Sequence, residues 1–142
     1  LWLNLGVLPF WIVLLFFPSS GVSKYMVRSI FPFMIFSFIY AYLLYYFFLT
    51  EFDFKNNFNL YLGLEQLSEL FSETGFLIMF WCHFLAINLF CGAWIVSDSL
   101  KFSMSKFLVF FPLLITYFIG PIGLFIYWLI RIFFAKKLSL YD

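Results

Sequence analysis

Three stretches of the chain run almost without charge for long enough to cross a lipid bilayer, at residues 30–49, 76–96 and 107–134. A fourth apolar stretch, residues 1–17, is nearly as long. A helix rises about 1.5 Å per residue, so roughly 20 apolar residues span a hydrocarbon core about 30 Å thick. The sequence therefore predicts a polytopic membrane protein with little chain left outside the bilayer for a soluble active site.

The composition agrees with this class. Hydrophobic residues make up 65% of the 142 residues and charged residues only 11%, against about 25% charged in soluble domains. A net charge of +1 argues against a nucleic-acid partner. The two cysteines, Cys82 and Cys91, face opposite sides of one predicted helix, so we expect them to pack as small apolar residues and not to pair.

We predict an all-α membrane protein, a single transmembrane domain over residues 1–142 with four transmembrane helices and a short amphipathic interfacial helix. The amphipathic helix covers residues 60–73, where apolar residues recur on one face and glutamates occupy the other. Its acidic face favours docking on protein over attraction to anionic lipid. The transmembrane spans are expected at 1–17, 28–50, 76–96 and 107–134.

The last predicted span carries the sequence Gly120-Pro121-Ile122-Gly123 in its middle. Proline frees a backbone carbonyl and bends a helix, and the glycines let another helix or a flat ligand approach closely. Four spans place both chain ends on one side of the membrane. The basic residues then divide equally and give no orientation: Lys24, Arg28, Lys101 and Lys106 on one side, and Lys55, Arg131, Lys136 and Lys137 on the other.

His83 is the only histidine and lies about a third of the way into the third span. We therefore expect His83 to be buried, and an ionisable residue at this depth is a candidate functional residue. A single imidazole suits axial ligation of a chlorophyll magnesium or a haem iron. With no second histidine, a structural role tying two helices together is preferred over this metal site. Asp98 could be a buried acid, but it lies in a Ser-Asp-Ser turn, so capping of the helix or solvation is the preferred interpretation.

The third span reads Trp-Cys-His-Phe-Leu-Ala-Ile-Asn-Leu-Phe-Cys-Gly-Ala-Trp-Ile over residues 81–95, and Asp98-Ser99 and Gly120-Pro121-Ile122-Gly123-Leu124 follow it. This pattern, which includes Val7-Leu8-Pro9-Phe10-Trp11 near the start, resembles the abscisic-acid-deficient-four-like family. These are small four-helix membrane proteins of plants, algae and cyanobacteria. In plants the resemblance, which covers nearly the whole chain, implies formation of the xanthophyll neoxanthin at plastid membranes.

Two positions depart from the family pattern: Asn88 stands where an aspartate is common, and Ala93 where an arginine is common. Asn88 can still form hydrogen bonds but cannot act as a general base. The expected cofactor is a carotenoid, a chlorophyll, or both. The candidate cofactor-binding residues are Trp81, His83, Asn88, Trp94, Gly120 and Gly123, with His83 also the candidate metal ligand.

We expect an integral multi-pass protein of a plastid membrane, specifically the thylakoid. Because both family charges are missing, the preferred interpretation is a non-catalytic accessory subunit of a photosynthetic pigment–protein complex, a photosystem or an antenna. The alternative is a xanthophyll biosynthesis factor or isomerase acting on the way to neoxanthin. A mitochondrial respiratory-complex accessory subunit is a further alternative. The expected partners are membrane lipids, a larger membrane protein complex and pigments.

Overall fold

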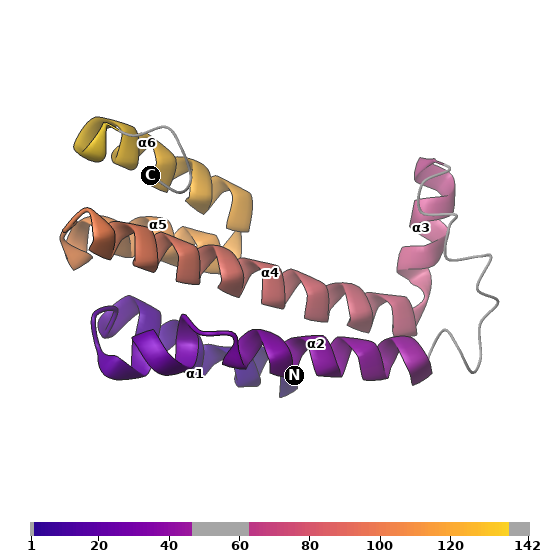
Figure 1. Cartoon of the computed structure of the whole chain (residues 1–142). Helices are drawn as coiled ribbons and strands as arrows, with labels where there is room; N and C mark the ends of the chain where they lie inside the picture. Colours follow the sequence, from indigo (N-terminus) through magenta and orange to yellow (C-terminus); the bar gives the residue numbers. More distant parts are fainter. Residues whose placement is uncertain (1, 47–62, 137–142) are drawn as a thin grey trace. The chain divides into compact units, whose positions relative to one another are not determined.

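The computed structural model describes residues 2–46 and 63–136, and every regular element within them is helical (Figure 1). The all-α class is therefore confirmed. The chain divides into two compact units, one formed by Leu1–Pro32 with Ile87–Asp142 and the other by Phe33–Ala86. The elements are α1 (Trp2–Phe16), the π-helical turn η1 (Ser23–Val27), α2 (Phe31–Leu44), α3 (Leu64–Ser72), α4 (Thr74–Lys101), α5 (Lys106–Phe118) and α6 (Gly120–Ala135).

Two helical stretches in the described residues are long and apolar enough to cross a membrane. They are Ser23–Leu44, with 22 residues, and Thr74–Lys101, with 28 residues. They correspond to the predicted spans 28–50 and 76–96, of which residues 47–50 lie outside the described part of the chain. Helices α1, α5 and α6 are apolar but shorter, so a total of four transmembrane helices stays a prediction.

The stretch predicted as one bent span, 107–134, is instead two helices that meet at Ile119 and Gly120. Helix α6 doubles back along α5 (Figure 1). Ile119 leaves the helical conformation, and Pro121 sits in the first turn of α6, where its missing N–H costs least. The break predicted as a bend is thus a reversal of chain direction.

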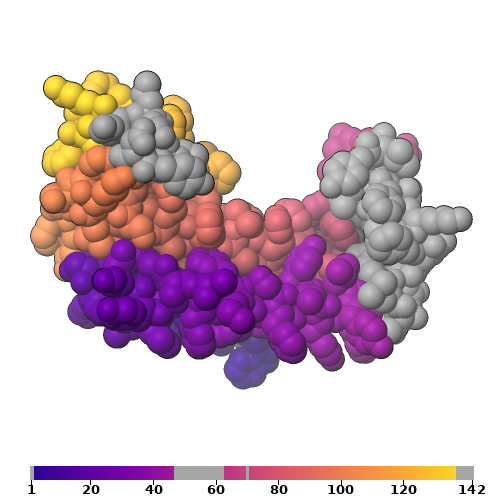
Figure 2. Space-filling model, viewed as in Figure 1, coloured from indigo at the N-terminus to yellow at the C-terminus, as the bar shows by residue number. Residues whose placement is uncertain are grey.

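The two helices of this α5–α6 hairpin approach closely because Gly123 has no side chain. A Cβ at Gly123 would lie 2.6 Å from the Cα of Thr116. Thr116 is fully buried and donates its hydroxyl to the carbonyl of Pro112 at 2.7 Å, so this polar group is satisfied within its own helix. Figure 2 shows the space-filling surfaces of α5 and α6, coloured orange to yellow.

Helix α1 packs into the same unit through Trp11, which is 2% exposed. Its ring lies against Gly92 of α4, where an added Cβ would come within 2.6 Å of a ring carbon, and meets the ring of Tyr117 edge-on at 5.4 Å. At the far end of α1, Lys106 donates a hydrogen bond to the carbonyl of Phe16 at 3.1 Å. One aromatic side chain therefore joins α1 to both α4 and α5.

In the second unit, α3 is fixed to the start of α4 by aromatic contacts. The ring of Phe71 meets those of Phe76 and Phe80 edge-on, at 5.1 and 4.8 Å. The predicted amphipathic helix 60–73 is thus present as Leu64–Ser72, and residues 60–62 lie outside the described chain. Part of its apolar face packs on α4, while docking on a partner protein stays a prediction.

Replacing Gly123 by alanine is expected to destabilise the protein by about 1–3 kcal/mol, because the methyl group would overlap the backbone of α5. The measurement is unfolding of the detergent-purified chain, followed by circular dichroism. Gly6→Ala is the matched control, since nothing lies within 4 Å of its added Cβ. Equal unfolding midpoints for the two variants would contradict the close helix approach.

Candidate functional site

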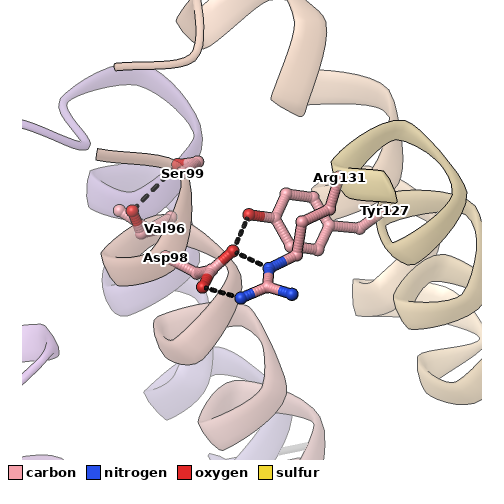
Figure 3. Close-up of polar contacts among 5 residues, drawn as sticks. All are labelled: Val96, Asp98, Ser99, Tyr127 and Arg131. Atoms are coloured by element: carbon pink, nitrogen blue, oxygen red, sulfur yellow. Dashed lines mark hydrogen bonds and ion pairs between the residues drawn. The ribbon is translucent and has the colours of Figure 1, made fainter. Parts of the chain in front are cut away.

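A buried polar cluster joins the end of α4 to α6 through Asp98, Tyr127 and Arg131 (Figure 3). Arg131 donates from Nε to Asp98 Oδ2 at 2.6 Å and from Nη2 to Asp98 Oδ1 at 3.1 Å. The hydroxyl of Tyr127 donates to Asp98 Oδ2 at 2.5 Å. Arg131 and Tyr127 have no exposed surface, and Asp98 is 6% exposed. A bidentate, charge-assisted ion pair of this kind offsets the desolvation cost of burying the carboxylate and the guanidinium.

Aromatic rings surround the guanidinium of Arg131. Its Cζ lies 5.2 Å from the ring centre of Phe102 and 5.9 Å from that of Trp94. Trp94, a predicted site residue, also meets the ring of Tyr127 edge-on at 5.8 Å. The cation therefore faces a carboxylate on one side and aromatic rings on others, which stabilises a charge removed from water.

This cluster was not predicted from the sequence. We expected capping or solvation of Asp98 in preference to a buried acid, and we counted Arg131 only among the basic residues on one side of the membrane. One signal was available: Tyr127 and Arg131 are four residues apart and so share one face of a helix. Their partner could not be identified because the reversal at Ile119, which brings α6 back to the end of α4, was not predicted.

A second polar position lies where the α5–α6 hairpin turns. The side chain of Asn88 is 5% exposed, and its Oδ1 lies against the position that a Cβ of Gly120 would occupy. Its Nδ2 has no hydrogen-bond partner in the described residues. Asn88 is in the middle of α4, about 20 Å of helix from either end. A buried hydrogen-bond donor without a partner lowers the stability of a protein by about 1–3 kcal/mol. The amide of Asn88 therefore either destabilises the fold or binds a ligand.

The structure brings together three of the six predicted site residues. Asn88, Gly120 and Gly123 all lie at or beside the hairpin turn. Trp94 lies at the ion pair. The other two, Trp81 and His83, belong to the second unit.

His83 is exposed on its unit, although its depth in the span predicted burial. Its ring lies 6.3 Å from that of Tyr40 and 6.5 Å from that of Phe80. Trp81 is also exposed and stacks on Phe84 at 5.0 Å. No group of three histidine, cysteine, aspartate or glutamate side chains gathers in the described residues. Ligation of a magnesium or iron by His83 alone stays a prediction.

The surface of the hairpin also carries an open apolar groove of about 350 Å³. It is formed by side chains from the first turn of α5 and the second half of α6, and its walls offer almost no hydrogen-bonding groups. Such a groove suits an apolar chain or ring. Its lining residues are Leu108, Leu129, Ile130, Phe133 and Phe134.

Removing the carboxylate with Asp98→Leu is expected to cost about 3–5 kcal/mol, because it leaves the Arg131 cation buried without its partner. Tyr127→Phe removes a single hydrogen bond to a charged acceptor and should cost about 1.5–3 kcal/mol. The double variant Asp98→Leu, Arg131→Met removes both charges and should recover most of the lost stability. The measurement is the free energy of unfolding in detergent. A double variant no more stable than Asp98→Leu would show that the buried charge is not the cause.

Comparison with known proteins identifies the family. The sequence model of the ABA DEFICIENT 4-like family matches residues 1–127, which include Asn88, Asp98 and the hairpin turn. A curated relative, Protein ABA DEFICIENT 4, chloroplastic, from Arabidopsis thaliana, is 30% identical over 116 residues. The match covers 75% of this chain and 52% of the relative, so the chain spans about half the length of that protein. No solved structure matches. The chain belongs to the ABA DEFICIENT 4-like family.

Proposed function

We propose that this chain is a membrane protein of plastids that holds an oxygenated carotenoid, a xanthophyll, during the formation of neoxanthin. The observation that carries the proposal is the family match over residues 1–127, together with a relative whose name places it in the chloroplast. The apolar helices Ser23–Leu44 and Thr74–Lys101 support a place in the membrane, where carotenoids dissolve.

The hairpin turn offers the chemistry that would recognise an oxygen atom on an otherwise apolar ligand. The amide of Asn88 supplies an unpaired N–H donor in apolar surroundings, and Gly120 leaves backbone beside it without a side chain. A hydroxyl or another uncharged oxygen of the ligand would accept this hydrogen bond. The pairing would offset the cost that the unpartnered amide imposes on the protein alone.

The groups at the turn bind and orient; they do not transfer protons. The carboxamide of Asn88 neither gains nor loses a proton in the physiological pH range, so it cannot act as a general acid or base. The carboxylate of Asp98 accepts hydrogen bonds from Arg131 and Tyr127, so it is not available to a ligand. The role proposed for this site is therefore the presentation of a xanthophyll, with the apolar groove of the hairpin available to its hydrocarbon part.

One observation favours a second candidate function. Asn88 and Ala93, where the family resemblance implies an acid and a base, are both buried and uncharged. A chain that kept the family fold without its charges would suit the predicted role of accessory subunit in a pigment–protein complex. The family match favours the xanthophyll role, and the accessory role, like chlorophyll binding, stays a prediction.

Disrupting the gene for this chain in its own organism is expected to lower neoxanthin and to raise its xanthophyll precursors. Reintroducing the unaltered chain should restore the pigment pattern. An Asn88→Ala chain should restore it poorly, because losing a hydrogen bond in apolar surroundings weakens binding roughly 5- to 150-fold. The measurement is liquid chromatography of pigment extracts, with immunoblots to equalise the amounts of protein.

The matched control for Asn88→Ala is Ile87→Leu, which changes an exposed neighbour on the same helix. It should restore neoxanthin fully. Pigment pools that do not respond to loss of the chain, accompanied by loss of a photosynthetic complex, would reject the xanthophyll role in favour of the accessory role.

A further inference from the structure

We propose that one end of the first unit binds the anionic headgroups of lipids in the adjoining membrane leaflet. This basic end consists of the cationic residues Lys24, Arg28, Lys101, Lys106 and Lys136. The inference rests on the membrane location in the proposed function, but it concerns a different surface from the hairpin turn.

Contacts within the unit place these residues at the same end. Arg28 of the segment after η1 donates to Ser97 of α4 at 3.4 Å. Lys106, at the start of α5, donates to the carbonyl at the end of α1. Lys101 is the last residue of α4. Arg131 is paired with Asp98 near the same end of α4, and Lys136 comes little more than one helical turn after Arg131. The ends of α1, α4 and α6 and the start of α5 are thus gathered together.

The reversal at Ile119 produces this concentration of charge. A straight last span would carry Arg131 and Lys136 to the opposite side of the membrane, which is why the sequence alone predicted an equal division of basic residues. With α6 doubled back on α5, Lys136 joins Lys24, Lys101 and Lys106. The equal division is therefore corrected for the described residues, while Lys55 and Lys137 lie outside them.

Among the described residues of the unit, no carboxylate is left over to neutralise Lys24, Lys106 or Lys136. The only carboxylate in its described residues is that of Asp98, and Arg131 already neutralises it. The described residues of the other unit carry the opposite charge, with three glutamates and no lysine or arginine. The surplus of positive charge is thus specific to the basic end.

Apolar side chains beside the lysines favour a lipid surface over a free phosphate ion. Tyr25 is 71% exposed next to Lys24, and Phe107 is 79% exposed next to Lys106, each with the ammonium group near its ring. Rings at such positions can enter the boundary between headgroups and acyl chains, while the lysines reach the phosphates. Each basic residue near an anionic surface contributes about fivefold to binding, and salt reduces the effect.

The test is lipid retention by the full chain. The chain is purified in mild detergent with equal amounts of phosphatidylglycerol and phosphatidylcholine, and the bound lipids are counted by native mass spectrometry. We expect phosphatidylglycerol to be retained in at least tenfold excess. Replacing Lys24, Lys101, Lys106 and Lys136 together by glutamine should abolish this excess. The matched control, Glu65→Gln with Glu69→Gln and Glu73→Gln, should leave it unchanged.

Equal retention of the two lipids, or an excess that survives the lysine replacements, would overturn the inference. Displacement of phosphatidylglycerol by inorganic phosphate at constant ionic strength would overturn it in favour of a phosphate site. Recovery of the chain in a soluble fraction without detergent would instead contradict the membrane location in the proposed function. Circular dichroism of the lysine variant checks that its helices are retained.

Discussion

The buried ion pair between Asp98 and Arg131 is the constraint on which the arrangement of the first unit depends. Separating these charges in apolar surroundings is costly, so the two helices that carry them must meet at this point. Between Lys106 and Arg131 a single straight helix would extend about 38 Å and carry the arginine far from Asp98. The chain must therefore reverse, and the reversal occurs at Ile119 and Gly120.

Three further features follow from this reversal. The close packing of α5 and α6 requires a residue without a side chain at Gly123, and the turn brings Gly120 against Asn88 in the middle of α4. The same reversal returns Lys136 to the end of the unit where α4 finishes. The contact of Gly120 with Asn88 and the gathering of basic residues at the end of α4 are thus both consequences of one change in chain direction.

The sequence predicted the helical class, the two long apolar helices and the amphipathic helix, because hydrophobic length and helical periodicity are local properties of a segment. It also selected Asn88, Gly120 and Gly123 as candidate binding residues, a role that stays a prediction, and the structure places Asn88 beside Gly120. It could not predict the ion pair, since Asp98 and Arg131 meet only after the chain reverses. A segment with one proline and two glycines is compatible with a bent helix and also with a reversal of the chain. Which of the two forms depends on tertiary contacts such as that between Gly123 and Thr116. His83 was predicted to be buried from its depth in the span alone, whereas its side chain is exposed in the structure.

The central claim, that this member of the ABA DEFICIENT 4-like family holds a xanthophyll, is tested most directly by the pigment content of the native chain. The membrane is extracted in mild detergent, the complex containing the chain is isolated on a native gel, and its pigments are separated by chromatography. The account predicts a small species carrying an oxygenated carotenoid in a fixed ratio to the chain. Migration within a photosystem or antenna, with chlorophyll and no xanthophyll attributable to this chain, would contradict it.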